Sequence, residues 1–257
     1  MAISDLFSIE GKTAVVTGGS RGIGLMIAQG FVEAGAKVYI SSRKKEVCDE
    51  VAEELSKSGQ CISAPADLST EDGAIQLASQ VSDSESKLDI LVNNAGAAWG
   101  APIAEYPDSG FDKVMNLNVK GIFHCTKHFL PLLEAAATPE DPARVINIGS
   151  IDGIRVPLME NYAYSASKAG VHMLTRHLAH HLVDKNITIN AIAPGPFPSK
   201  MTKFIFEMGE EAVASQVPLK RVGRPDDMAG AAIFLASRAG SYLTGAVIPV
   251  DGGTARR

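Results

Sequence analysis

Short apolar runs rich in β-branched residues recur along the chain, and longer helical patterns separate them. Each run is nearly continuous rather than alternating, as expected for strands covered on both faces. The order predicts βαβ units and therefore an α/β fold of the Rossmann type, a doubly wound parallel sheet of about seven strands with helices on both faces. The predicted strands are residues 13–17, 37–40, 89–92, 145–148, 187–192 and 246–250, with a weaker one around residue 62; the helical patterns include residues 24–33 and 173–183.

Length and composition predict one globular domain over residues 1–257. The chain is 46% hydrophobic and 21% charged, and no linker-like stretch divides it. A net charge of −5 without a long basic run argues against nucleic-acid binding. No apolar stretch approaches the ~20 residues of a membrane helix, and the first residues lack a signal-peptide pattern. Because the cysteines (Cys48, Cys61 and Cys125) are scattered, we expect a cytoplasmic protein.

A glycine-rich turn follows the first predicted strand and precedes a helix. Glycines at positions 18, 22 and 24 allow a tight turn and a close approach of the backbone to a pyrophosphate. The free N–H groups and the positive end of the following helix would then bind the phosphates. The turn predicts a dinucleotide site made by Gly18, Ser20, Arg21, Gly22, Ile23 and Gly24.

The end of the second predicted strand favours NADPH over NADH. An NAD enzyme usually places a carboxylate here to hold the ribose 2′-hydroxyl, but Ser42 occupies that position and Arg43 follows it. Arg21, in the glycine turn, lies on the same side. Two guanidinium groups near one ribose suit a 2′-phosphate, because they bind it through charge-assisted hydrogen bonds.

Tyr164 and Lys168 are four residues apart and are therefore expected on one face of a helix. A tyrosine phenol has a pKa near ~10, too high for ready proton exchange at neutral pH. A nearby ammonium group favours the phenolate, so we expect Lys168 to lower the pKa of Tyr164 toward the working range. Ser150 follows a predicted strand, where its hydroxyl could donate to a substrate carbonyl.

Further polar residues lie at strand ends and in helical stretches. Asn93, Ala95 and Gly96 follow another predicted strand and could line a nicotinamide ribose, while Asn94 is expected to be scaffold. Asn118 lies in a helical stretch, where a buried amide is usually a structural hydrogen-bonding group.

Taken in order, these motifs resemble those of the short-chain dehydrogenase/reductase family over essentially the whole chain, and within it the bacterial 3-oxoacyl reductases, including those of rhamnolipid formation. The resemblance implies that Tyr164 is the general acid and that Lys168 binds the ribose and lowers the pKa of Tyr164. It implies further that Ser150 orients the substrate carbonyl and that Asn118 holds a water in a proton relay. It also implies cofactor contacts from Asp67, Leu68, Pro194, Gly195, Phe197 and Ser199, with Ser199 in place of the usual threonine.

The expected substrate is a small-molecule ketone of the β-ketoacyl type, reduced with NADPH. Residues 196–218 are the expected substrate lid, in which Met201, Phe204, Ile205 and Met208 form an apolar stripe at helical spacing. The stripe suits an acyl chain or packing against the domain equally well. Acidic residues before Arg144 (Glu134, Glu140 and Asp141) argue against docking of an acidic acyl carrier, so the sequence disfavours a carrier-linked substrate and leaves a free or CoA-linked ketone open.

Two histidine pairs, His124/His128 and His177/His181, have i,i+4 spacing on predicted helices. Neither has a glutamate at zinc-protease spacing, so no metal site is expected. The resemblance places these helices at a dimer interface, and we expect protonation of the histidines to weaken a homodimer or homotetramer.

Two other functions remain open on the sequence. The first is oxidation of a sterol or sugar alcohol, against which Ser42 and Arg43 argue because cellular NADPH usually drives reduction. The second is a non-catalytic protein that senses NADP(H), which would not need an intact set of Ser150, Tyr164 and Lys168.

Overall fold

The computed structural model describes residues 3–199, 202, 206, 207 and 209–256. In that part of the chain, seven strands form one sheet in the order β3-β2-β1-β4-β5-β6-β7, and all neighbouring pairs are parallel. The strands are β1 (Thr13–Thr17), β2 (Lys37–Ser41), β3 (Gln60–Ser63), β4 (Ile90–Asn93), β5 (Ala143–Ile148), β6 (Ile187–Pro194) and β7 (Val247–Val250). The predicted doubly wound parallel sheet is confirmed, and the weak run around residue 62 is a strand.

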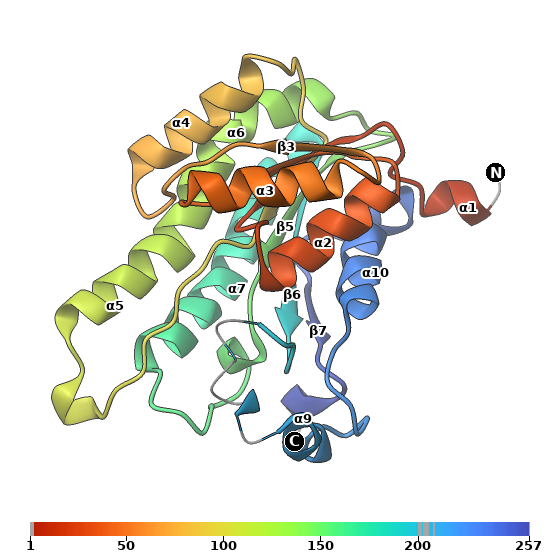
Figure 1. The fold of residues 1–257 in the computed structure, drawn as a ribbon. Helices are drawn as coiled ribbons and strands as arrows, with labels where there is room; N and C mark the ends of the chain where they lie inside the picture. Colours follow the sequence, from red (N-terminus) through yellow and green to blue (C-terminus); the bar gives the residue numbers. More distant parts are fainter. Residues whose placement is uncertain (1–2, 200–201, 203–205, 208, 257) are drawn as a thin grey trace.

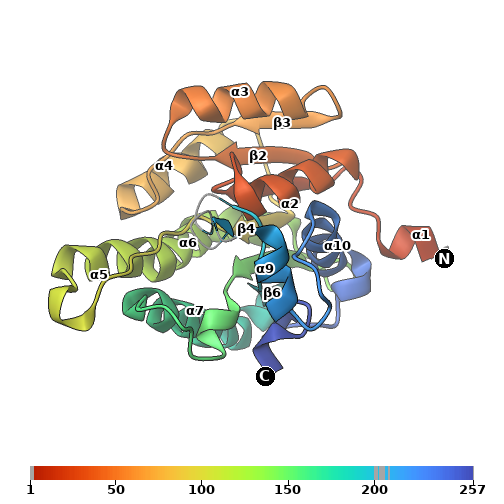
Figure 2. The ribbon, with the colours of Figure 1, turned by 60° about the horizontal axis from the view of Figure 1, so that its bottom comes forward.

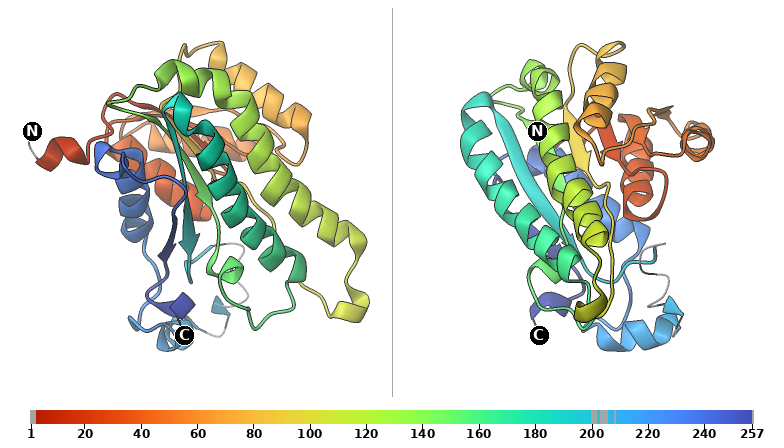
Figure 3. Two further views of the ribbon diagram at one scale, coloured as in Figure 1. Left: turned by 180° about the vertical axis from the view of Figure 1, so that it is seen from behind. Right: turned by 90° about the vertical axis from the view of Figure 1, so that its left-hand side faces the viewer.

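Helices cover both faces of the sheet. On one face lie α2 (Gly22–Glu33), α3 (Lys45–Leu55) and α10 (Pro225–Ala236); on the other lie α4 (Glu71–Ser82), α6 (Gly121–Ala136) and α7 (Tyr162–Leu182). Figure 1 shows the first set in front of the sheet, and Figure 3 shows α7 beside the long helix that contains α5 (Asp108–Met115) and α6. The remaining described α-helices are α1 (Ile3–Leu6) and α9 (Glu210–Gln216).

Each face of the sheet has its own hydrophobic core. On β1, Ala14 and Val16 pack with α2, α3 and α10, whereas Val15 points to the other face and packs with α4, α6 and α7. Because successive side chains of a strand point to opposite faces, a strand buried on both must be apolar at every position. This explains why the apolar runs of the sequence are continuous.

A π-helical turn, η2 (Asn116–Lys120), joins α5 and α6 into one helix. Gly121 follows it where the helix passes the Asp67–Leu68 segment: a Cβ at this glycine would lie 2.7 Å from the Leu68 carbonyl oxygen. Gly121, the first residue of α6, therefore lies against the segment after β3. Turns of this type occur frequently at functional sites.

The segment expected to be a substrate lid, residues 196–218, lies beyond the carboxyl end of β6. Its described helix, α9, lies in front of β6 when the molecule is viewed from below (Figure 2). The predicted apolar stripe of Met201, Phe204, Ile205 and Met208 lies outside the described residues. Among the described helices, none combines the length and apolar character needed to cross a membrane.

Candidate active site

Four loops meet at the carboxyl ends of the central strands. The glycine turn follows β1, residues 94–97 follow β4, the Ser150 turn follows β5 and residues 195–199 follow β6. The strand order reverses between β1 and β4, and ligands of open parallel sheets bind at such a switch point. The fold therefore gathers most of the candidate residues at one edge of the sheet.

The glycine turn after β1 is closed by contacts that leave no space for side chains. Gly18 has φ of 65°, in the region that favours glycine. A Cβ at Gly24 would lie 2.3 Å from both the Asn94 Nδ2 and the Gly18 carbonyl oxygen. Asn94 donates from this nitrogen to the carbonyls of Thr17 and Gly18, at 2.8 and 3.2 Å, which agrees with its expected scaffold role.

The turn presents the amino end of α2, where the first backbone N–H groups lack helical partners. Arg21 is the residue before this helix, in an extended conformation, and no side chain caps the helix end. Gly22 follows with φ of 55°, Ser20 is buried and Ile23 is half-buried. This arrangement fits a pyrophosphate, because the open N–H groups and the helix dipole both attract an anion.

Two arginines lie at this edge without a carboxylate partner. Arg21 and Arg43 are exposed, and neither forms an ion pair with any of the described residues. Ser42 donates its hydroxyl to the Lys44 carbonyl at 3.2 Å and brings no negative charge. The charge pattern after β2 therefore suits a phosphate better than a bare ribose hydroxyl.

The candidate residues after β3 and β4 differ in how exposed they are. Asp67 is exposed but binds the Ser69 backbone and hydroxyl through one carboxylate oxygen, and Leu68 is buried. Ala95 and Gly96 are half-buried in the loop after β4, and the Ala95 N–H donates to the Thr17 hydroxyl. Main-chain groups of this loop border the nucleotide cradle.

The Asn93 side chain is buried in a hydrogen-bond network below the end of β4. Its amide donates to Thr126 at 3.2 Å and to Asn147 at 2.9 Å, and Asn147 in turn donates to Thr175 at 3.0 Å. All four side chains are buried. A buried amide needs such partners, so the network fastens the sheet to α6 and α7. The Asn93 side-chain nitrogen is thus occupied by protein, whereas its buried side-chain oxygen has no hydrogen-bond partner among the described residues.

Three of the expected catalytic side chains lie together. Tyr164 and Lys168 are on successive turns of α7, and the Lys168 ammonium lies 5.5 Å from the centre of the Tyr164 ring. Ser150, in the turn after β5, accepts the Asp152 N–H at 3.1 Å and forms a side-chain hydrogen bond with the Tyr164 phenol. Lys168 donates to the Ile148 carbonyl at 2.7 Å, which holds it beside the end of β5.

The pKa of Tyr164 differs from the sequence expectation. Burial raises the pKa of this phenol to about 12; the hydrogen bond from Ser150 acts in the opposite direction, and the charge of Asp152 adds to the rise. Lys168 is itself buried, and burial lowers the pKa of its ammonium group to about 8. Desolvation disfavours the charged form of each group, so it outweighs the attraction that the i,i+4 spacing suggested.

The Asn118 side chain is held in place by hydrogen bonds within the protein. Its side-chain oxygen accepts the Ala97 N–H at 2.8 Å, and its nitrogen donates to the Ala97 carbonyl and the Ser167 hydroxyl, both at 2.9 Å. The residue is fully buried, so its amide is occupied by protein. Asn118 ties the loop after β4 to α7, and any contact with a relay water would come from its main chain.

The residues after β6 are packed rather than open. The Gly195 N–H donates to the Val250 carbonyl at 2.9 Å, and Pro194 is the last residue of the strand. The Phe197 side chain is buried under Gly223, so only its main chain can contact a cofactor. The Ser199 hydroxyl lies 3.0 Å from that of Thr202. Thr202 was not a sequence candidate, and it offers a second hydroxyl at this position.

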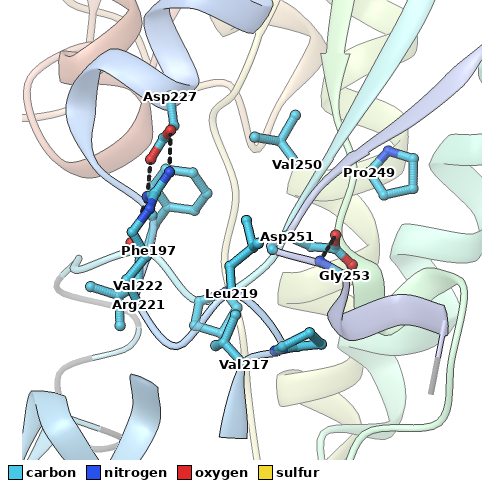
Figure 4. Close-up of a pocket in the computed structure, with 14 residues that line it drawn as sticks. Phe197, Val217, Leu219, Arg221, Val222, Asp227, Pro249, Val250, Asp251 and Gly253 are labelled. Atoms are coloured by element: carbon cyan, nitrogen blue, oxygen red, sulfur yellow. Dashed lines mark hydrogen bonds and ion pairs between the residues drawn. The ribbon is translucent and has the colours of Figure 1, made fainter. Parts of the chain in front are cut away.

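A cavity of about 530 Å³ lies beyond these residues, between the segment after β6, residues 217–223 and the end of β7. Figure 4 shows its largely apolar lining, with Arg221 and Asp227 joined by hydrogen bonds at one side. None of Ser150, Tyr164 and Lys168 is among the described residues that line it. This cavity is therefore separate from the expected catalytic side chains.

His172 lies behind the Ser150 turn and was missed by sequence reasoning, although it is one turn beyond Lys168. A Cβ at Gly149 would lie 2.2 Å from its Nε2, and one at Gly153 would lie 2.9 Å from its Cε1. The ring therefore fills the space between the two glycines that flank Ser150. Burial lowers the pKa of His172 to about 4, and the charge of Lys168 acts in the same direction.

This shift predicts a loss of stability in acid. Below its ordinary pKa of 6.5 the histidine takes up a proton in the unfolded chain but stays neutral in the fold until about pH 4. The free energy of unfolding should therefore fall as the pH drops through this window, and the contribution of His172 is about 3 kcal/mol. Urea unfolding of His172→Gln between pH 7 and 4 should show a flatter pH dependence. His180→Gln, at an exposed position, is the control. If the unfolding free energy of the wild type, His172→Gln and His180→Gln depended equally on pH, the prediction would be refuted.

Comparison with known proteins agrees with this geometry. The sequence model of the family described as Enoyl-(Acyl carrier protein) reductase matches residues 18–255. The chain is 53% identical over 249 residues to the rhamnolipids biosynthesis 3-oxoacyl-(acyl-carrier-protein) reductase of Pseudomonas aeruginosa, covering 96% of this chain and 97% of the relative. It is 38% identical over 274 residues to the short-chain dehydrogenase/reductase PhomF of Diaporthe leptostromiformis, covering 97% and 93%.

The fold is equally similar to a solved structure. The Pseudomonas aeruginosa RhlG/NADP active-site complex superposes with a TM-score of 0.95 at 52% identity, covering 98% of this chain and 99% of that one. Sequence and structural similarity thus extend over the whole sheet and its loops. The chain therefore belongs to the short-chain dehydrogenase/reductase family.

Proposed function

We propose that this protein is an NADPH-dependent reductase that acts on the ketone of a 3-oxoacyl compound. The observation that carries the proposal is the grouping of Ser150, Tyr164 and Lys168 beside the glycine cradle, at the switch point of the sheet. The activity named for the 53% identical Pseudomonas aeruginosa relative, a 3-oxoacyl-(acyl-carrier-protein) reductase, supports the same substrate class.

The cradle residues support NADPH as the cofactor. Gly18, Gly22 and Gly24 leave the backbone open to a pyrophosphate, while Arg21 and Arg43 stand free for a 2′-phosphate. The similar RhlG structure is described as an NADP complex. When bound, this cofactor supplies the hydride.

The chain's own residues would then manage the carbonyl oxygen. Ser150 is placed to donate a hydrogen bond to that oxygen and to stabilise the charge that develops on it. Tyr164 would deliver the proton, and its raised pKa means that the phenol carries this proton at neutral pH. Lys168, mostly charged below pH 8, would stabilise the phenolate left behind.

The positions of the acidic residues before β5 do not exclude a carrier-linked substrate. The acidic residues that argued against a carrier-linked substrate precede β5 and so lie at the amino end of the sheet, opposite the site. Two of them are also paired: Asp141 with Lys12 at 2.7 Å and with Arg144, and Glu134 with Lys185. They therefore do not oppose docking at the Tyr164 edge, and a carrier-linked or CoA-linked 3-oxoacyl group fits the proposal.

The other functions fit less well. Oxidation of a sterol or sugar alcohol fits less well with Ser42 and Arg43, because they favour NADPH and cellular NADPH usually drives reduction. A protein that only senses the cofactor would have no use for the hydrogen-bonded Ser150 and Tyr164 pair. We propose further that the enzyme works in the cytoplasm as a homo-oligomer, a setting that suits its three free, buried cysteines.

Consumption of NADPH with a panel of ketones tests the proposal. The panel contains 3-oxoacyl-CoA and 3-oxoacyl-carrier substrates, a keto sugar and a steroid ketone, each also tried with NADH. We expect the highest kcat/KM with a 3-oxoacyl substrate and at least about tenfold preference for NADPH, most of which Arg43→Ala removes. Turnover confined to the sugar or steroid, or a preference for NADH, would refute the proposal.

A further inference from the structure

A group of potential metal ligands lies between α4 and α6, away from the catalytic side chains. Glu71 is the first residue of α4, and His124 and His128 are one turn apart on α6. One ligand atom from each residue can be chosen so that all three lie within 4.8 Å of one another. The two helices pack side by side on the same face of the sheet, so this juxtaposition is part of the fold.

The distances within the group resemble those of a coordination sphere. The Glu71 Oε1 lies 3.0 Å from the His128 Nε2 and 3.7 Å from the His124 Nδ1. Zinc binds histidine nitrogens and carboxylate oxygens at about 2.0–2.2 Å, and tetrahedral ligands at that radius are about 3.3 Å apart. Small rotations of these half-buried side chains would suffice to place a cation among the three atoms.

One ligand atom also lacks a partner. The His124 Nδ1 is buried and has no hydrogen-bond partner among the described residues. A buried polar atom without a partner is unfavourable, and a metal ion would satisfy it.

A neighbouring cation competes for the carboxylate. The Lys127 ammonium lies 2.7 Å from the same Glu71 oxygen that faces both histidines. Lys127 is more than half exposed, so it can turn into solvent when a divalent cation takes its place. Competition from the Lys127 ammonium would lower the affinity of the site for a divalent cation, but Lys127 competes only for the carboxylate and not for the histidine nitrogens.

We propose that Glu71, His124 and His128 form a binding site for a divalent transition-metal ion of the zinc type, which clamps α4 to α6. Two imidazoles and one carboxylate are a ligand set that suits Zn²⁺, Co²⁺, Ni²⁺ and Cu²⁺. The sequence alone predicts no metal because no glutamate lies at zinc-protease spacing from these histidines in the chain. The glutamate comes from a different helix.

The chain contains a matched control. His177 and His181 have the same i,i+4 spacing on α7 and stack with ring centres 4.8 Å apart, but both are exposed. Among the described residues, no carboxylate joins these two histidines in a group of three potential ligands. If helical spacing alone bound the metal, the two pairs would behave alike.

Titration calorimetry with Zn²⁺ and absorption spectra with Co²⁺, both on metal-free full-length protein, test the site. We expect one Zn²⁺ per chain, a rise in Tm on binding and a Co²⁺ spectrum typical of four-coordination. Glu71→Gln and His124→Ala should each weaken binding at least about tenfold. His177→Ala/His181→Ala should leave it unchanged, and Lys127→Ala should tighten it several-fold because the competing ammonium is gone.

Three results would overturn the proposal. One is the absence of stoichiometric Zn²⁺ binding to the wild type. The second is equal affinity of wild type and Glu71→Gln, which would remove the carboxylate from the site. The third is loss of binding in His177→Ala/His181→Ala. Because Glu71 is partly exposed and NADPH binding reports on folding, a folded Glu71→Gln variant can be verified independently.

Discussion

Replacement of Tyr164 by Phe is expected to lower kcat about 10²–10⁴-fold while leaving the Kd for NADPH within about threefold of wild type. The substitution removes only the phenolic oxygen, which is the proposed proton donor and the partner of Ser150. The ring itself remains and keeps its place 5.5 Å from the Lys168 ammonium. Steady-state reduction of a 3-oxoacyl substrate and a fluorescence titration with NADPH measure the two quantities.

Tyr162 provides the matched control for this experiment. It lies two residues earlier in α7, is exposed, and its hydroxyl bonds only Glu160 at 2.9 Å. Tyr162→Phe should therefore keep wild-type kcat. If Tyr164→Phe retained more than a tenth of the activity, the proton would have to come from another group, and the proposed mechanism would be wrong.

Gly24→Ala is expected to weaken NADPH binding about 10–100-fold. The new methyl group would lie 2.3 Å from the Asn94 Nδ2 and from the Gly18 carbonyl oxygen, and those two groups are hydrogen-bonded to each other at 3.2 Å. Neither can move without opening the turn that binds the pyrophosphate. Overpacking of this kind costs about 1–3 kcal/mol, and every 1.4 kcal/mol lost from binding is a factor of ten.

Gly230→Ala, in α10, is the control for this substitution. Apart from the local helix backbone, no atom of the described residues lies within 4 Å of a Cβ at that position, so alanine should raise helix stability by up to about 1 kcal/mol and leave NADPH affinity unchanged. Calorimetric titration with NADPH and urea unfolding measure both effects. Wild-type affinity of Gly24→Ala would show that the turn adapts and that its tight packing does not shape the cofactor site.

The sequence by itself determined the architecture and most of the candidate residues. Continuous apolar runs specify strands buried on both faces, and the spacing between them specifies parallel crossovers. The glycine turn after β1 could be recognised because side chains are excluded at Gly18 by its positive φ and at Gly24 by close contacts. Tyr164 and Lys168 could be paired because i,i+4 spacing is a local property of a helix. Such information lies within a few neighbouring residues.

Only the tertiary structure decided how exposed these groups are and which distant partners they meet. Burial raises the pKa of Tyr164 although a lysine is nearby, and long-range hydrogen bonds occupy the side chains of Asn93 and Asn118. Glu71 reaches His128 from another helix. Desolvation and contacts of this kind depend on which elements pack together, and the local spacing of residues contains no record of that packing.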